Sequence, residues 1–299
     1  MGKLCGLFGK TRAALYDQQK RLQSEVMVQD IILHYVQQIR TTLPRLGTRK
    51  LHYKLEPLLK DHGIKVGRDY LFDLLEAHKM LIRQRRRKVV TTNPLAWLRQ
   101  FPNLIKDLEI IRPEQVWVSD ITYIRLINQW GYLSLVTDAY SRRIMGYAFR
   151  TDLKAQGCTD ALQMALDARV YQYLELIHHS DKGSQYGSDL YLKLLRDHEI
   201  SISVTQKRDP YENALAERVN GILKNEFDLY ECNLGFKAAA KRVADCIRIY
   251  NEQRPHSSCN YLTPQQAHCC QGVLQKKWKD YPRKKAVHQM APSVTFKTK

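Results

Sequence analysis

Three acidic residues stand apart from the other carboxylates of this sequence because of where they fall. Asp120 interrupts a strongly apolar segment, and Asp181 comes directly after another apolar run. Glu217 lies on a segment with helical periodicity. Carboxylate oxygens are the ligands that Mg²⁺ prefers, and three converging carboxylates can hold the two ions that catalyse phosphoryl transfer. The competing interpretation of the pattern alone is a set of surface acids with one helix cap.

The elements that must position these acids begin after residue 113. Segment 116–124 is rich in β-branched and aromatic residues on both alternating faces, which predicts a strand buried on both sides. Two further strands are expected at 132–137 and 143–150, and then helices alternate with strands. The expected helices cover 158–170, 188–198, 213–229 and 236–251, and the expected strands cover 174–179 and 200–204. This order predicts an α/β layer with a mixed sheet.

The expected sheet gives the first two acids a chemical context. A buried charge at Asp120 would cost several kcal/mol unless a partner, most simply a cation, compensates it. Asp181 follows the carboxyl end of a strand, where α/β sheets place ligands, and Gly183 allows a sharp turn beside it.

The third acid lies on a helix with two distinct sides. Leu215, Val219, Ile222 and Phe227 mark an apolar side. Glu217, Asn220, Gly221 and Lys224 fall together on another side, at spacings of three, four and seven. We therefore expect Glu217 to face a site and Lys224 to hold a phosphate next to it.

The charge of the chain is large and unevenly distributed. With 48 Lys and Arg against 30 Asp and Glu, the 299 residues carry a formal charge of +18. Residues 1–113 have a net charge of +12, residues 114–229 of −3 and residues 230–299 of +9. Basic flanks around an acidic middle favour a polyanionic partner held by the flanks, although any single basic run can also be a solvated surface.

The N-terminal region is expected to be helical. We expect one helix ending near Tyr16 and a second from about Ser24 to Arg40. Two short amphipathic helices then surround a glycine-containing turn, with Thr48 as the cap of the first and Gly63 at its end, which resembles a helix-turn-helix. A helical hairpin without a DNA role is the alternative. Pro57 is expected to kink the first helix or shift its boundary.

These features give five expected segments. They are an N-terminal helical segment (1–40), a helix-turn-helix-like DNA-binding region with a basic linker (41–92), a linker (93–111), a catalytic core (112–269) and a basic C-terminal tail (270–299). The basic linker contains five cations within residues 83–88 and is suited to lie along a DNA backbone.

The cysteines and the hydropathy exclude several classes of protein. Seven scattered cysteines without a CxxC pair favour reduced thiols. A zinc site formed by His256, Cys259, His268, Cys269 and Cys270 is a weaker alternative, because the spacings match no usual ligand pattern. No apolar run is long enough for a membrane span or a secretory signal, so we expect a cytoplasmic protein.

Three motifs carry a resemblance to a known family. They are Trp117-Val118-Ser119-Asp120-Ile121-Thr122-Tyr123, His179-Ser180-Asp181-Lys182-Gly183-Ser184-Gln185-Tyr186 and Asn213-Ala214-Leu215-Ala216-Glu217-Arg218 followed by Lys224. The acids are separated by 60 and then 35 residues. Together with Tyr250-Asn251-Glu252-Gln253-Arg254-Pro255-His256, these motifs resemble insertion-sequence transposases and retroviral-type integrases. The chain is most similar to the second-reading-frame protein of insertion sequence family three, including that family's helix-turn-helix segment and its usual opening at Leu4–Arg12.

The resemblance implies a fold, a reaction and a ligand set. The fold would be RNase H-like, with Asp120, Asp181 and Glu217 binding two Mg²⁺ or Mn²⁺ ions. The reaction would be cleavage of the element's ends to expose 3′-hydroxyl groups, followed by their joining to target DNA. Homo-oligomers on DNA, an upstream-frame partner protein or frameshift fusion, and a location at the nucleoid of a bacterium are also implied. We expect DNA contacts from Asn213, Arg218, Lys224, Arg49, Lys50, Arg68, Arg85, Arg86 and Arg87.

Two departures and three alternatives accompany the resemblance. Lys207-Arg208-Asp209 replaces a more usual Lys-Gly-Asn, and the tail from residue 271 matches nothing. An RNase H-type nuclease would share the fold and metals without needing the basic helical segment. A non-catalytic DNA-binding regulator derived from a transposase would bind the same DNA. A covalent tyrosine recombinase is disfavoured, since no Arg/His constellation accompanies any of the 17 tyrosines.

The basic run supplies a first prediction. Replacing Arg85, Arg86 and Arg87 by glutamine should weaken DNA binding and reduce the slope of log K against log [salt] by roughly one unit for each phosphate that is no longer bound. Fluorescence anisotropy across a salt series measures this slope. An unchanged slope would mean that the run is only a solvated linker.

Overall fold

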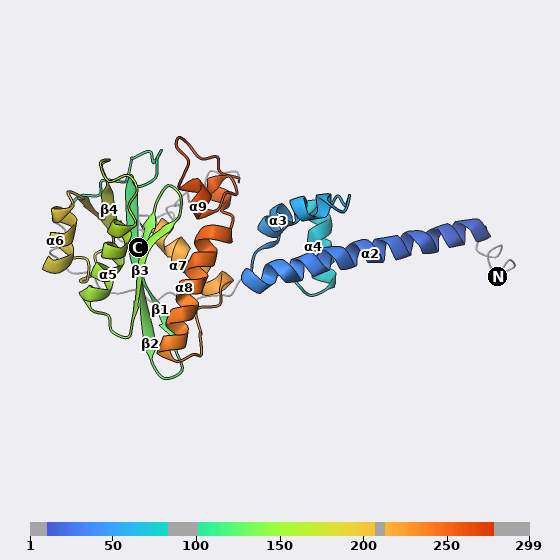
Figure 1. Ribbon diagram of the computed structural model, residues 1–299, viewed down its shortest axis with the longest axis horizontal. Coiled ribbons are helices and arrows are strands. Elements are labelled where there is room, and N and C mark those ends of the chain that lie inside the picture. The colour runs from blue at the N-terminus through green and yellow to red at the C-terminus, as the bar shows by residue number, and fades with distance from the viewer. Residues whose placement is uncertain (1–10, 83–100, 207–212, 278–299) are drawn as a thin grey trace, which may run out of the picture.

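The computed structural model describes residues 11–82, 101–206 and 213–277, which form a helical region and an α/β core (Figure 1). The predicted contacts of Arg85, Arg86 and Arg87, the unusual Lys207–Asp209 segment and the end of the basic tail lie outside these residues. Within them, no helix is both long and apolar enough to cross a membrane.

A five-stranded mixed sheet forms the centre of the core. Its strands are β1 (Val116–Arg125), β2 (Trp130–Asp138), β3 (Ile144–Arg150), β4 (Ile177–Ser180) and β5 (Ser201–Val204), in the order β3-β2-β1-β4-β5. The first three strands pair antiparallel as a meander, β4 pairs parallel to β1, and β5 pairs parallel to β4. The predicted α/β class and the mixed sheet are confirmed, and this order is that of the RNase H-like fold.

Helices cover both faces of the sheet. α5 (Ala155–Asp167) and α6 (Asp189–Asp197) cover one face, and α7 (Ala214–Glu226) and α8 (Phe236–Gln253) cover the other (Figure 1). A 3₁₀ turn, η2 (Ser257–Cys259), and a short helix, α9 (Pro264–Ala267), follow α8. The face under α5 and α6 is filled by side chains such as Trp117, Leu162 and Tyr191, all of which are buried.

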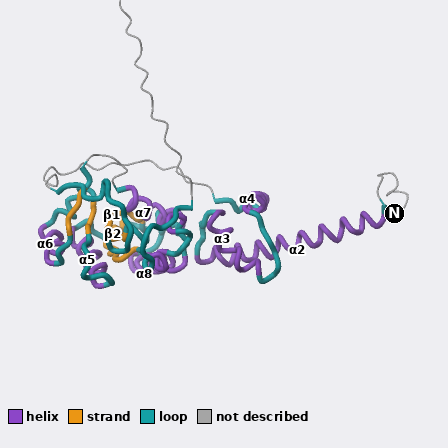
Figure 2. Tube along the Cα trace, turned by 90° about the horizontal axis from the view of Figure 1, so that it is seen from above, coloured by secondary structure: helices purple, strands orange, loops and turns teal. Residues whose placement is uncertain are grey.

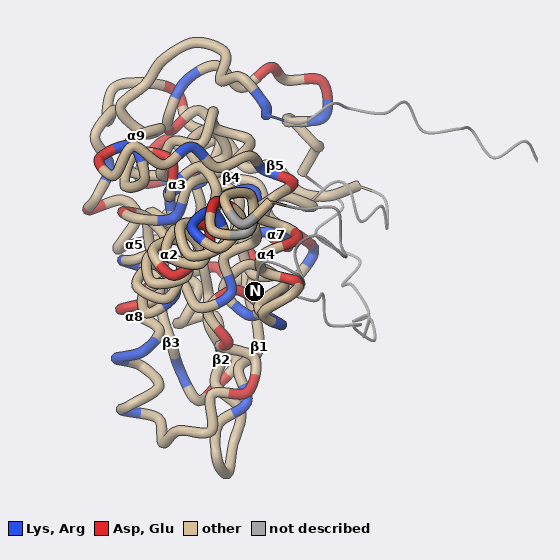
Figure 3. The backbone as a smooth tube through the Cα atoms, turned by 90° about the vertical axis from the view of Figure 1, so that its right-hand side faces the viewer, with Lys and Arg blue, Asp and Glu red and all other residues tan. Residues whose placement is uncertain are grey.

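The described part of the N-terminal region, residues 11–82, contains three helices beside the α7–α8 side of the core. They are α2 (Arg12–Thr42), α3 (Thr48–Lys60) and α4 (Arg68–Ala77). One continuous apolar cluster joins Ile32 and Leu55 of these helices to Val219 and Tyr250 of α7 and α8. Seen from above, α2 continues well past this packed region (Figure 2). Acidic and basic positions are interspersed over both the helices and the core (Figure 3).

The helical region differs from the expectation in two places. α2 is a single helix where a break near Tyr16 was expected, because residues 17–24 contain neither glycine nor proline to interrupt it. Gly47, and not Thr48, occupies the N-cap of α3. Pro57 lies inside α3, on its exposed side, where water can satisfy the carbonyl that loses its partner.

The connection between α3 and α4 contains the expected glycine, but it is longer than the turn of a typical helix-turn-helix. Gly63 does follow the end of α3, with φ +67°, and its N–H donates to the carbonyl of Lys60. The connection between the two helices covers residues 61–67, which is longer than the three or four residues of a typical helix-turn-helix turn.

Close packing of β3 on α5 supplies a second prediction. A Cβ at Gly146 would overlap the carbonyl oxygen of Ala161 and would lie 2.6 Å from the backbone nitrogen of Ala165. Gly146→Ala should therefore lower the free energy of unfolding by about 1–3 kcal/mol, since backbone must shift to admit the methyl group. Urea denaturation measures the change. Gly235→Ala is the matched control, because a Cβ there meets nothing within 4 Å, and equal losses in both variants would contradict this packing.

Candidate active site

The pairing of two parallel strands brings the first two acids together. β1 and β4 pair from Val116–Ile177 to Ser119–Ser180, and the register ends there. Asp120 is the next residue of β1, and Asp181 directly follows the last residue of β4, so the two acids emerge side by side where the ladder ends. The sheet thus explains why two residues with 60 others between them meet.

Asp120 is held by an amide and not by the cation that the sequence suggested. The Asn220 Nδ2 group of α7 donates to Asp120 Oδ2 at 2.7 Å, and the backbone N–H of Ile121 donates to Oδ1 at 2.9 Å. Burial raises the pKa of Asp120 to about 7, helped by the charges of Asp181 and Glu217. Asn220 opposes that rise without supplying positive charge.

Asp181 and Glu217 complete a group of coupled carboxylates. Burial raises the pKa of Asp181, and the backbone N–H of Gly183 donates to its Oδ1 at 3.0 Å. Glu217 lies in the first turn of α7, and its side chain is exposed. Partial loss of contact with water, followed by the charge of Asp181, raises its pKa. Within the described ranges none of the three forms an ion pair with a lysine, arginine or histidine.

The donor chemistry of this group suits a hard divalent cation. Burial raises the pKa of all three carboxylates, and the charge of a neighbouring acid adds to the rise at Asp120 and Glu217. Added positive charge stabilises such a group, and Mg²⁺ prefers oxygen ligands. In the described part of the chain, however, no three His, Cys, Asp or Glu side chains lie close enough together to enclose an ion. Binding of an ion by all three therefore requires the carboxylates to move closer together.

The residues expected to contact DNA from α7 have different surroundings. Arg218 is exposed and lines a cavity next to Glu217. Lys224 lies over the ring of Tyr230, 5.8 Å from its centroid. Asn213 is buried, and its Nδ2 donates to the carbonyl of Ser119 at 3.4 Å, so it joins α7 to β1.

The expected DNA contacts of the helical region are also dispersed. Arg49 is exposed at the start of α3 and lines the same cavity as Arg218. Lys50 is half-buried and donates to Glu226 Oε1 at 3.3 Å. Arg68 is exposed at the start of α4 and pairs with Asp69 at 2.8 Å.

An ion cluster at the end of α7 was not anticipated. Arg254 is 1% exposed, and its Nε and Nη2 each donate to the carboxylate of Glu226 at 2.8 Å. Burial alone would raise the pKa of Glu226, but Arg254 and then Lys50 lower it. Burial, followed by the charge of Arg254, lowers the pKa of Lys50 to about 8. The Arg254-Pro255-His256 motif was visible in the sequence, but nothing there indicated its partner.

The residues of the alternative zinc site have other partners. Cys259 Sγ lies near the carbonyls of Tyr140 and Ser141, at 3.8 and 3.6 Å. His268 lies between Glu114 and Ser141, at 3.2 and 3.0 Å. The structure does not bring the five candidate ligands together as a metal cluster, and all five lie within the described residues.

Comparison with known proteins places the chain in a family. Two family models, each described as an integrase core domain, match residues 111–210 and 198–264. The "Insertion element IS600 uncharacterized 31 kDa protein" of Shigella sonnei is 33% identical over 267 residues, which is 87% of this chain and 96% of that protein. "Transposase InsF for insertion sequence IS3A" of Escherichia coli K12 is 36% identical over 164 residues, 54% of this chain and 57% of InsF. The chain belongs to the IS3 family of DDE transposases.

A solved structure is similar in the core. The catalytic core domain of HTLV-2 integrase, solved in complex with magnesium, is 21% identical, with a TM-score of 0.41, and the match covers 52% of this chain and 97% of that one. The family assignment makes the IS3-family chain a DNA transposase of the DDE type, and so a polynucleotidyl transferase.

The raised pKa of Asp120 supplies a third prediction. Its folded-state pKa is about 7, against about 4 for an unfolded aspartate, so folding favours the protonated form. Wild-type stability should therefore fall as pH rises from about 4 to 7 and level off above that, while Asp120→Asn escapes this loss. Thermal melts with a chelator present measure the difference. Parallel pH profiles of the two proteins would contradict the raised pKa.

Proposed function

We propose that Asp120, Asp181 and Glu217 bind divalent metal ions and carry the strand cleavage and joining of this transposase. The observation that supports the proposal is their electrostatic coupling where the parallel ladder between β1 and β4 ends, and no cation of the described residues pairs with them there. Such an arrangement is unfavourable in isolation and becomes favourable when cations bind.

The ions would be two Mg²⁺ or Mn²⁺. When bound, they would lower the pKa of the attacking hydroxyl group and stabilise the leaving oxygen. Asn220 would orient Asp120 through its 2.7 Å hydrogen bond, and the N–H of Gly183 would orient Asp181. Glu217, which is exposed, would approach from the DNA side of the site.

The proposed reaction has two phosphoryl transfers. In the first, the oxygen of water attacks a phosphorus atom at each element end, and the departing oxygen becomes a 3′-hydroxyl. In the second, that hydroxyl attacks a phosphodiester of target DNA, and another 3′-oxygen leaves. Each step exchanges one P–O bond for another, so neither needs ATP or a protein nucleophile.

The flanking segments would hold the DNA. We propose that 41–92 binds the element's terminal repeats, that 112–269 is the catalytic core, and that 1–40 and 270–299 are accessory segments. Arg49 and Arg218, which line one cavity, would contact phosphates beside Glu217. The need to act on two element ends favours a homo-oligomer, and an upstream-frame partner or frameshift fusion would add recognition of the ends.

The catalytic proposal gives a fourth prediction. Glu217→Gln should lower cleavage of DNA carrying the terminal repeats by about a thousandfold, since removal of a metal ligand takes away several kcal/mol of transition-state stabilisation. The neutral side chain should leave binding of the same DNA intact. Gel assays with Mg²⁺ measure cleavage and joining, and anisotropy measures binding.

The control is Glu252→Gln, which removes an exposed carboxylate of α8 that pairs with Arg248 and is not part of the carboxylate group. It should behave as the wild type. Wild-type protein that binds the ends but neither cleaves nor joins them would instead support the non-catalytic regulator. Cleavage without any joining would support the RNase H-type nuclease.

A further inference from the structure

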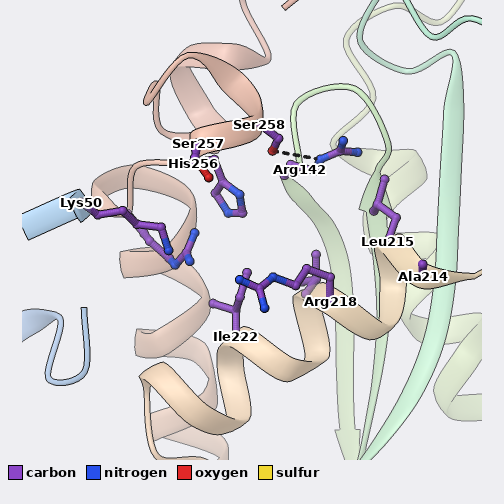
Figure 4. A pocket seen from close by; sticks show the side chains of 11 residues that line it. Lys50, Arg142, Ala214, Leu215, Arg218, Ile222, His256, Ser257 and Ser258 are labelled. Carbon is purple, nitrogen blue, oxygen red and sulfur yellow. Dashed lines mark hydrogen bonds between the residues drawn. The ribbon is translucent and has the colours of Figure 1, made fainter. Parts of the chain in front are cut away.

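A basic pocket lies between α3, α7 and the segment that follows α8. It has a volume of about 470 Å³ (Figure 4). Its polar lining comes from Lys50, Arg142, Arg218, Arg254, His256 and the serines 257 and 258. A neighbouring cavity of about 800 Å³ shares Lys50 and Arg218 with it and is also lined by Glu217. The pocket is therefore next to the proposed active site but separate from its carboxylates.

The pocket has more positive than negative charge. Four cations line it, and the nearby carboxylate of Glu226 is bonded to two of them, Arg254 and Lys50. Arg142 and Arg218 form no ion pair with any described residue. The side chain of Arg142 is nevertheless fixed, because it donates to Ser258 Oγ at 3.4 Å and to the carbonyl of Ala139.

His256 gives the pocket an unused buried polar atom. Its side chain is 6% exposed, and its Nε2 has no hydrogen-bond partner in the described structure. The ring points into the pocket, between Lys50 and Arg218 (Figure 4). Burial and the surrounding cations lower its pKa well below the ordinary value, so the ring is neutral. A buried nitrogen without a partner is unfavourable unless a ligand supplies one.

We propose that this pocket binds one backbone phosphate of the element DNA, with Arg142 and Arg218 supplying charge and His256 Nε2–H donating a hydrogen bond. The proposal rests on the proposed function, because it requires that the chain bind DNA, and it assigns a site to one phosphate. A phosphodiester fits better than a free anion, since the volume leaves room for flanking sugars and the adjoining cavity leads to Glu217.

The position of the pocket gives phosphate binding a second effect. Lys50 comes from α3 in the helical region, whereas Arg218 and His256 come from the core. A phosphate bound among them would fasten the helical region to the core at the moment when DNA occupies the active site. The same contact would fix the position of the strand that passes Glu217.

The test neutralises one phosphate of the DNA at a time. Duplexes carrying the element end, each with a single methylphosphonate, are titrated with wild-type protein and with Arg142→Gln in EDTA. In the wild type, a methylphosphonate at one particular phosphate should weaken binding by about tenfold, as expected when a charged hydrogen bond is removed. Arg142→Gln should bind unmodified DNA about tenfold more weakly. A methylphosphonate at the same phosphate should not weaken its binding any further. If the methylphosphonate at that phosphate still weakened the binding of Arg142→Gln by about tenfold, the proposal would be overturned.

Further variants separate the pocket from general charge effects. Arg248→Gln removes an exposed arginine of α8 that pairs with Asp245 and Glu252, and it should keep the wild-type profile. His256→Phe keeps an aromatic ring against Tyr250 but removes the ring nitrogen. Its binding should therefore also become insensitive to a methylphosphonate at that phosphate. Arg142→Lys retains the positive charge, so it should restore part of the effect that Arg142→Gln removes. Thermal melts establish that each variant is folded.

The assay also distinguishes the proposal from its alternatives. If inorganic phosphate raises the melting temperature of wild type but not of Arg142→Gln, while no methylphosphonate position differs between them, the pocket serves a free anion and the DNA assignment fails. Because EDTA removes metal, the result is independent of catalysis. Protein that passes this test without cleaving DNA in Mg²⁺ would refute only the catalytic proposal.

Discussion

Four residues of parallel pairing between β1 and β4 determine the geometry of the whole site. The ladder stops at Ser119 and Ser180, so the next two side chains are both acids at the same edge of the sheet. A shift of the register by one residue would turn Asp120 to the opposite face of the sheet. The helices on both faces, and the apolar clusters beneath them, hold the strands in this register.

The same pairing creates an electrostatic cost that the rest of the core must tolerate. Burial and like charge both disfavour ionised Asp120. The side-chain amide of Asn220 and the backbone N–H of Ile121 offset part of this cost by donating hydrogen bonds to the carboxylate. At the end of α7, by contrast, the buried carboxylate of Glu226 is paired with Arg254. The contrast supports a division between charges that stabilise the fold and charges that are kept available for a ligand.

Local sequence patterns were sufficient for most of the core. The strand at 116–124 and the helices at 213–229 and 236–251 have clear periodicities, and each lies within a few residues of its observed bounds. The pairing order and the Asn220 contact depend on tertiary packing, which a periodicity does not encode. The strand expected from residue 174 begins at Ile177, because residues 171–174 form a turn that leaves Tyr173 and Leu174 exposed. Similarly, Arg254 pairs with Glu226 of α7, 28 residues earlier in the sequence, and His256 shares a pocket with residues of α3 and α7.

The length of α2 has a mechanical consequence. Its apolar contacts with the other helices begin near Val28, so the preceding residues, from Arg12 to Met27, extend from a packed base. At 1.5 Å per residue this part of α2 is about 24 Å long, and a rotation of about 10° at the base would move its tip by roughly 4 Å. The seating of Ile32 and Val36 therefore sets where the start of α2 points. Small changes in that packing would be amplified along the helix as along a lever.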